Sequence, residues 1–324
     1  MNPYIGHESQ TAGIEEHRLI GGKGDGMRLY EVHTEAGLDM TVSLDRAGDI
    51  SRLRYKGINL SYFSPCGYVA PAYYESTGTN WLKSFTAGFL TTCGLQGVGT
   101  PCVDEGEEIP LHGSLANFPA EHSYWTEEAD AFVIHTVTRD ETIFGRKLSL
   151  SRELRISKQE SRFTIHDLIE NRGDKEEPFE ILYHMNMGYP LLDEDSVITI
   201  PSVEVLPRDK HAANDIEHWS RMEKPQAGYQ ERCYYHRFRD KNGYARIEQP
   251  KCNVALTISY DASVLDGFVE WKMMGVRDYV LGLECGNCLP DGRDVMRENE
   301  MLKFLKPGES QEYTVNINIE SLGK

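Results

Sequence analysis

Hydrophobic and polar residues alternate along much of this chain. In the segment 313–320, valine and isoleucine occupy every second position, with threonine and asparagine between them. The segment 148–156 has a similar period with leucine and isoleucine. Side chains of a strand point alternately to its two faces, so this period predicts strands with one buried face. Further runs with the composition of strands are 132–138, 163–169, 179–187, 197–200, 254–260 and 279–283.

Segments with the 3.6-residue period of a helix are scarce. We expect one helix over 8–19 and a short one over 214–222. Turn-forming sequences at 171–174, 241–243 and 307–308 separate strand segments. Many short strands and few helices are typical of a sandwich rather than of alternating β–α units. The sequence therefore predicts an all-β protein, a large antiparallel β-sandwich with few short helices.

The sequence offers no obvious place to divide the chain. It has no internal repeat, low-complexity tract or linker-like segment. We therefore expect a single domain over residues 1–324, with residues 1–40 as an N-terminal extension packed on it. The region 62–108 is less regular and is rich in glycine, threonine and cysteine. Long irregular connections within a β scaffold often carry binding sites, so this region is a candidate for one.

Charge and cysteine content exclude some classes of partner and location. The 324 residues carry a formal net charge of −17, which argues against nucleic acid or an anionic membrane surface as a partner. No segment approaches the ~20 consecutive apolar residues of a membrane span. The first residues lack the basic and apolar regions of a secretory signal. Seven scattered cysteines suit free thiols in a reducing compartment, so we expect a cytoplasmic protein with Cys285 and Cys288 unpaired.

Polar residues interrupt apolar surroundings in three segments, 111–117, 181–190 and 280–287. His184 lies within an apolar strand segment, and Glu284 ends another at a turn that contains glycine. Burying an unpaired carboxylate is costly, so we expect Glu284 to contact partners, water or a ligand. Each residue taken alone also fits a structural role, because most buried histidines are simply hydrogen-bonded and most glutamates at strand ends face water.

Together, these segments resemble the aldose 1-epimerase (galactose mutarotase-like) superfamily, above all a poorly characterised bacterial branch labelled as a domain of unknown function. The motifs that carry the resemblance are GFLTTCGLQGVG at 88–99, LHG at 111–113, YHMNMGYPL at 183–191, WKMM at 271–274 and YVLGLE at 279–284. Two features depart from the pattern. Cys285 stands where the family tends to place proline. The Asn-Arg pair that holds sugar hydroxyls in galactose mutarotases has no clear counterpart, and Thr91 and Thr92 lie nearest.

The resemblance implies a galactose mutarotase-like supersandwich and an aldose 1-epimerase-like isomerase that interconverts sugar anomers. This reaction needs an acid and a base but no metal or redox cofactor, so we expect no cofactor. By analogy Glu284 is the base and His184 the acid. The candidate substrate-binding residues are His112, Glu231, Lys272, Thr92, Asn186 and Trp81. We expect five of these side chains to converge in one cleft: His112, His184, Glu231, Lys272 and Glu284. Within it, Glu284 and His184 should face each other across a space wide enough for a monosaccharide ring.

Two other functions remain open at this point. One is a non-catalytic sugar-binding or sensing module, because a fold does not fix a function. The other is a metal-dependent sugar isomerase or epimerase with His112, His184 and a carboxylate as ligands, although no histidine pair has short metal-ligand spacing. We expect nearby carboxylates to raise the pKa of His184. The expected partner is a small-molecule sugar or sugar derivative, and the sequence leaves open whether the chain forms a homodimer.

Overall fold

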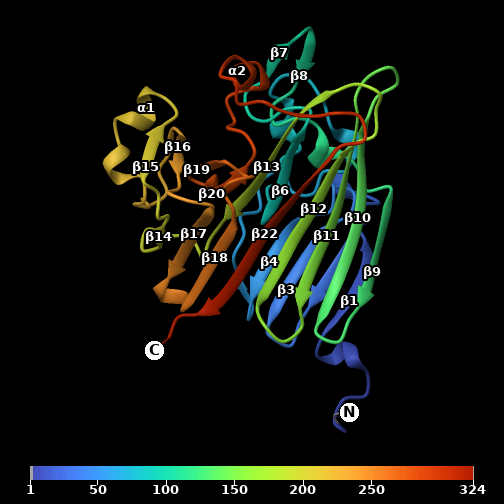
Figure 1. Ribbon diagram of the computed structural model, residues 1–324. Coiled ribbons are helices and arrows are strands. Elements are labelled where there is room, and N and C mark those ends of the chain that lie inside the picture. Colours follow the sequence, from blue (N-terminus) through green and yellow to red (C-terminus); the bar gives the residue numbers. More distant parts are fainter. Residues whose placement is uncertain (1–2, 324) are drawn as a thin grey trace.

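The alternating segments of the sequence form strands in the computed structural model, which describes residues 3–323 (Figure 1). All eight segments predicted as strands are strands. Neighbouring strands of the large sheets run antiparallel. The prediction of an all-β, antiparallel sandwich is therefore confirmed.

Three large sheets and one hairpin contain all the described strands. The largest has eight strands in the order β14 (Val197–Thr199), β17 (Asn242–Gln249), β18 (Val254–Asp261), β22 (Ser310–Ser321), β12 (Arg162–Asn171), β11 (Lys147–Ser157), β10 (Ala131–Glu141) and β9 (His122–Glu127). A seven-stranded sheet has the order β15 (Glu204–Pro207), β16 (Arg232–Arg237), β19 (Gly267–Met274), β20 (Tyr279–Gly286), β13 (Glu177–Met187) and β21 (Lys303–Leu305), with β6 (Leu90–Leu95) also paired to β13. The third contains β1 (Gly13–Arg18), β2 (Arg28–His33), β3 (Leu38–Ser43), β4 (Asp49–Tyr55) and β5 (Ile58–Asn59). The hairpin pairs β7 (Cys102–Asp104) with β8 (Glu107–Ile109).

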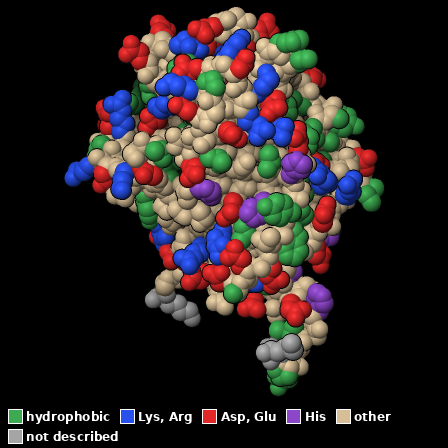
Figure 2. All heavy atoms as spheres, turned by 45° about the vertical axis from the view of Figure 1, so that its right-hand side comes forward, with side chains coloured by type: hydrophobic (Ala, Val, Ile, Leu, Met, Phe, Trp, Pro, Cys, Tyr) green, Lys and Arg blue, Asp and Glu red, His purple; other side chains and the backbone are tan. Residues whose placement is uncertain are grey.

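Helices are short and lie in the connections. Within residues 3–323 the α-helices are α1 (Lys210–Ala213) and α2 (Arg293–Glu298). The 3₁₀ turns are η1 (Glu8–Gln10), η2 (Gly22–Gly24), η3 (Pro71–Tyr73), η4 (Asn80–Lys83), η5 (Leu115–Asn117), η6 (Ile216–His218) and η7 (Pro250–Cys252). None of the helices that the structure describes has the length and apolar character needed to cross a membrane. Acidic and basic side chains are interspersed over the face shown in Figure 2.

The hydrophobic core lies between the eight-stranded sheet and the other two large sheets. Figure 1 shows the eight-stranded sheet in front, with strands of the five-stranded sheet behind it. Leu154 and Ile165 from the first sheet, Val42 from the five-stranded sheet, and Met185 and Leu283 from the seven-stranded sheet are all fully buried in this core. Because alternate residues of a strand point to opposite faces, the residues between them on β13 and β20 face away from the core.

Both helix predictions were wrong. Residues 8–19 contain the turn η1 and the strand β1, which pairs with β2 at the edge of its sheet. Most residues of β1 are exposed, so hydrophobic and polar residues do not alternate along it and its sequence lacks the pattern of a strand. Residues 214–222 contain only the 3₁₀ turn η6.

The segment expected to be an N-terminal extension contributes strands to a sheet. Residues 13–40 supply β1, β2 and the start of β3. Tyr30, Val32 and Met40 are buried in the hydrophobic core. This part of the chain is therefore integrated into the sandwich rather than laid on its surface.

A charged network is buried between the sheets around Arg152. Its guanidinium donates hydrogen bonds to Asp167 at 2.8 and 2.7 Å, to Asp49 at 2.9 Å and to the hydroxyl of Thr92 at 2.8 Å. Thr92 in turn donates to Asp49 at 2.6 Å. The side chains of Arg152 and Asp167 are fully inaccessible to solvent. A buried ion pair needs such satisfied partners, so Thr92 acts here as a structural residue.

Thr92→Val should lower the free energy of unfolding by about 1.5–3 kcal/mol, because it removes hydrogen bonds to two buried charged groups while keeping the side-chain shape. Urea unfolding at neutral pH measures this change. Thr164→Val provides a matched control, since its hydroxyl bonds only Asn316 at the exposed surface of the eight-stranded sheet. Equal stability of the two variants would contradict the structural role of Thr92.

Candidate functional site

A cavity of about 400 Å³ opens on the face of the seven-stranded sheet that is turned away from the core. This volume is within the range of roughly 300–1,000 Å³ that is typical of small-molecule sites. His184 of β13 and Glu284 of β20 both line it. The two residues are directly paired across the neighbouring strands, so their side chains emerge side by side on the same face.

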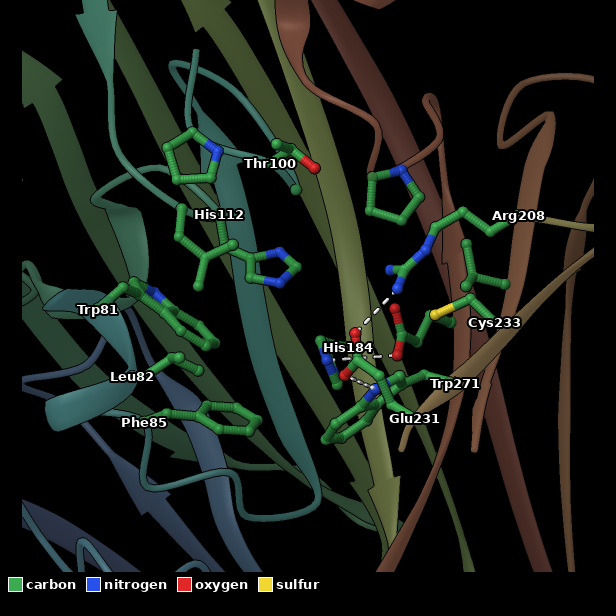
Figure 3. Close-up of a pocket in the computed structure, with 16 residues that line it drawn as sticks. Trp81, Leu82, Phe85, Thr100, His112, His184, Arg208, Glu231, Cys233 and Trp271 are labelled. Carbon is green, nitrogen blue, oxygen red and sulfur yellow. Dashed lines mark hydrogen bonds and ion pairs between the residues drawn. The ribbon is translucent and has the colours of Figure 1, made fainter. Parts of the chain in front are cut away.

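The cavity has one apolar and one polar wall. Trp81, Leu82 and Phe85, on and after η4, lie on one side in Figure 3. Arg208 and Glu231 lie on the opposite side, with His184 between the walls. The remaining residues that line the cavity are Gly99, Thr100, Pro101, Leu111, His112, Cys233, Val269, Trp271, Glu284 and Pro290.

His184 and Glu284 are in direct contact in the floor of the cavity. The Nε2 atom of His184 is 3.3 Å from Oε1 of Glu284, and the two side chains are only 5% and 2% exposed. Aromatic rings surround the imidazole, with centroid distances of 5.4 Å to Phe85, 5.7 Å to His112 and 5.3 Å to Trp271. These contacts fix the position of the imidazole beside the carboxyl group. The prediction that the two side chains face each other across the width of a sugar ring was therefore wrong, because the strand register pairs them directly.

Burial determines which of the two groups carries a proton. Removal from water disfavours charge, so it raises the pKa of Glu284 well above its ordinary 4.5 and lowers the pKa of His184 well below 6.5. The Glu231 carboxylate adds to the first shift, and His112 adds to the second. The prediction that carboxylates raise the pKa of His184 was wrong, because desolvation dominates. Burial therefore favours the uncharged form of both groups, with the proton on Glu284.

Backbone contacts hold His112 over the cavity. Its N–H donates to the carbonyl of Gly99 at 3.0 Å, and its own carbonyl accepts from the N–H of Gly94 at 3.1 Å. His112 has a φ of +57° and is followed by Gly113 at +68°. A Cβ at Gly113 would lie 2.5 Å from the carbonyl oxygen of Gly94, so only glycine fits there. Burial lowers the pKa of His112 to about 4, which keeps the ring neutral.

The low pKa of His112 should make the fold less stable in acid. An unfolded histidine takes up a proton near pH 6.5, whereas His112 in the folded protein does so only near about 4. Between these values the unfolded chain binds more protons, so stability falls as the pH falls. Asparagine tolerates a positive φ, so it fits at this position. In the His112→Asn variant the free energy of unfolding, measured by urea titration at several pH values, should decline less steeply as the pH falls. His122→Asn on the exposed strand β9 is the control. If the free energy of unfolding falls equally steeply with pH in the wild type and in His112→Asn, the lowered pKa of His112 is contradicted.

Four polar atoms around the cavity are buried without a hydrogen-bond partner among the described residues. They are Trp81 Nε1, His112 Nδ1, His184 Nδ1 and Glu284 Oε1. The 3.3 Å contact of Glu284 with His184 does not have the geometry of a hydrogen bond. Unpaired buried polar groups are rare in proteins and costly. All four belong to residues that line the cavity, which makes it the best candidate for binding a polar ligand.

The structure brings five of the eight sequence-derived candidates to this cavity. Trp81, His112, His184, Glu231 and Glu284 line it. The roles assigned to them remain predictions.

The other three candidates lie outside the cavity lining. Thr92 belongs to the buried Arg152 network. The side-chain amide of Asn186 donates to the backbone carbonyl of His184 at 2.9 Å, so it contacts the strand beside His184 without lining the cavity. Lys272 points to the other face of β19, where it contacts Glu223 at 2.9 Å. The expected convergence of Lys272 with the other four residues was therefore wrong.

Arg208 is a cavity residue that the sequence analysis missed. It follows β15, and its guanidinium donates to Glu231 at 2.8 Å. The second oxygen of Glu231 accepts from the indole N–H of Trp271 at 2.7 Å. No motif surrounds Arg208, so only the fold could bring it next to Glu231. Within residues 3–323, no three His, Cys, Asp or Glu side chains are grouped so that they could hold a metal ion.

Comparisons with known proteins agree with this architecture. A family model described as "Domain of unknown function (DUF4432)" matches residues 24–319. No curated protein matches the chain.

Solved structures allow the fold to be compared directly. A "putative aldose 1-epimerase" from Klebsiella pneumoniae has a TM-score of 0.88 and 24% identity, covering 94% of this chain and 83% of the other. A galactose mutarotase-like protein from Clostridium acetobutylicum has a TM-score of 0.69 and 13% identity, covering 97% and 100%. A galactose 1-epimerase from Lactobacillus acidophilus has a TM-score of 0.64 and 13% identity, with the same coverage. At these identities the likeness shows a galactose mutarotase-like fold.

Proposed function

The chain belongs to the DUF4432 family, and we propose that it binds a monosaccharide in the cavity beside His184 and interconverts its anomers. The observation that carries this proposal is a cavity of about 400 Å³ lined by the buried, adjacent pair His184 and Glu284 and by two further residues, Trp81 and His112, that each have a polar atom without a hydrogen-bond partner. A sugar presents several hydroxyl groups that can pair with such atoms. The galactose mutarotase-like fold of the chain adds support, since proteins described as aldose epimerases share it.

The reaction requires two proton transfers on the sugar. One group takes the proton from the anomeric hydroxyl while another protonates the ring oxygen, and the bond between C1 and the ring oxygen breaks as the C1 carbonyl forms. Rotation about the C1–C2 bond then exposes the other face of the carbonyl. Ring closure reverses both proton transfers, so nothing is consumed.

His184 and Glu284 can supply both transfers because together they hold one exchangeable proton. With the proton on Glu284 the pair is an acid and a neutral imidazole. Once the two side chains, 3.3 Å apart, rotate into a hydrogen bond, moving the proton to His184 gives a carboxylate and an imidazolium, the base and acid that the sequence resemblance implies. The net charge of the pair is the same in both forms, so this shift adds no unpaired charge to the buried site. The pair gives one proton to the sugar, takes one back, and remains ready for ring closure.

His112 and Trp81 complete the site as binding residues. Their rings are 4.7 Å apart between centroids, and each has one unpaired nitrogen. We assign both residues to the binding of sugar hydroxyls, with Leu82 and Phe85 covering the C–H face of the ring.

A saturation-transfer NMR screen of aldoses tests the binding half of this proposal. We expect at least one aldose to bind, and Thr100→Trp at the exposed rim of the cavity to weaken that binding by blocking entry. Thr126→Trp on exposed β9 should bind as the wild type does. Failure of every aldose to bind, or equal effects of the two tryptophan variants, would count against a sugar site here.

A further inference from the structure

We propose that the cavity is specific for an uncharged sugar, with Arg208 and Glu231 acting together as a clamp for two neighbouring hydroxyl groups. This inference rests on the proposed function and specifies its substrate class. The Arg208–Glu231 clamp consists of the guanidinium and the carboxylate, joined by a hydrogen bond of 2.8 Å at the polar wall. Figure 3 shows both side chains extending into the space opposite Trp81.

The charges that line the cavity balance one another. Arg208 is the only lysine or arginine among the residues lining it, and Glu231 already pairs with it. The burial of Glu284 beside His184, together with the nearby carboxylate of Glu231, favours the uncharged form of the Glu284 carboxyl group. A carboxylate or phosphate on the ligand would therefore find no unpaired cation and would lie close to Glu231. The net charge of −17 on the whole chain adds to this unfavourable field.

The clamp retains hydrogen-bonding capacity for a diol. Arg208 has five N–H donors, of which one bonds Glu231, and no other side-chain partner occurs among the described residues. Each oxygen of Glu231 accepts one bond, from Arg208 or from Trp271 at 2.7 Å, and each carboxylate oxygen can accept a second. A free donor thus lies beside a free acceptor. Adjacent hydroxyls of a sugar, each both donor and acceptor, match this arrangement.

The supports of the clamp keep it in place without a ligand. The backbone N–H of Arg208 donates to the carbonyl of Cys233 at 3.0 Å. The indole of Trp271 fixes the other end of Glu231. Preorganised groups lose less conformational entropy when a ligand binds, so the clamp is suited to selecting a particular pair of hydroxyls.

The opposite wall fits the other face of a sugar ring. Trp81 and Phe85 stack with their ring centroids 4.5 Å apart and an interplanar angle of 25°. Trp81 is itself only 1% exposed, so Leu82 and Phe85 supply the apolar surface on this side for the C–H groups of a pyranose. A sugar held between this wall and the clamp would place its remaining edge over His184 and Glu284.

Paired titrations at fixed ionic strength test the charge specificity. The probes are D-galactose, D-glucose and D-mannose, each compared with its uronate and its 6-phosphate by isothermal titration calorimetry. For each sugar that binds, we expect the uncharged form to bind at least about tenfold more tightly than either anionic form, since juxtaposed like charges are strongly unfavourable. Tighter or equal binding of a uronate or phosphate, with anomer exchange intact, overturns the inference and leaves the proposed function standing.

A charge-removing variant tests the clamp itself. Glu231→Gln frees Arg208 from its counter-charge, so the affinity ratio of uronate to uncharged sugar should rise by about tenfold. Glu312→Gln removes the same charge from an exposed position on β22 and should leave the ratio unchanged. Thermal unfolding first shows whether both variants are folded. If they are, and their affinity ratios of uronate to uncharged sugar are equal, the clamp is contradicted. If none of these three sugars binds the wild type, the same pairs are made from the aldoses that bind in the saturation-transfer screen. If no aldose binds at all, the proposed function fails and this inference fails with it.

Discussion

Replacing Glu284 with glutamine is expected to slow anomer exchange by about 10²–10⁴-fold, which is the usual contribution of one positioned acid or base. Glutamine keeps the shape of the side chain and can still hydrogen-bond a sugar, but it cannot exchange a proton. Sugar binding should therefore remain within a few-fold of the wild type. Polarimetry, with spontaneous mutarotation subtracted, gives the rate, and saturation-transfer NMR gives the binding.

A second buried glutamate offers a matched control for this variant. Glu270 on β19 lies 3.4 Å from His236, and both side chains are fully buried, yet neither lines the cavity. Glu270→Gln alters a similar Glu–His contact on the core-facing side of the same sheet. It should leave the exchange rate per folded molecule unchanged. Equal losses in both variants would mean that the effect of Glu284→Gln comes from the fold rather than from the chemistry.

His184→Asn should also lower the exchange rate by about 10²–10⁴-fold. Asparagine keeps a polar side chain on β13 but removes the imidazole that shares the proton with Glu284. Because the pair acts as a unit, the double variant with Glu284→Gln should lose little more than either single variant. Multiplicative losses in the double variant would indicate that the two residues act independently.

Sequence periodicity predicted the strands well, because most of them bury one face in the core. It also placed His184 and Glu284 correctly on strands. Their direct pairing depends on the register between β13 and β20, which are almost 100 residues apart in sequence and carry no local signal for it. The edge strand β1 was mistaken for a helix because it is exposed on both faces.

The remaining errors at the site have similar physical causes. Lys272 and Trp271 are neighbours on β19, so only one of them can face the cavity, and the sequence could not show which. Thr92 was a candidate because it lies nearest the position of the Asn-Arg pair of galactose mutarotases, yet β6 turns its hydroxyl to the Arg152 network. The pKa of His184 was misjudged because the acidic composition of the chain says nothing about the burial of one imidazole.

Catalysis by the Glu284–His184 pair predicts a rate of anomer exchange above the spontaneous rate, which sugar binding alone does not predict. A module that only binds sugar would leave the two anomers to interconvert at their spontaneous rate. A catalyst would accelerate this exchange without changing the equilibrium ratio of anomers.

Two-dimensional exchange NMR on an equilibrated aldose that binds the wild-type protein is the most direct test of the central claim. We expect cross peaks between the α and β anomeric protons whose build-up rate rises in proportion to protein concentration. With Glu284→Gln at the same concentration and comparable occupancy, the rate should return close to the spontaneous value. A spontaneous rate with the wild-type protein, for every aldose shown to bind, would contradict catalysis and leave a sugar-binding module.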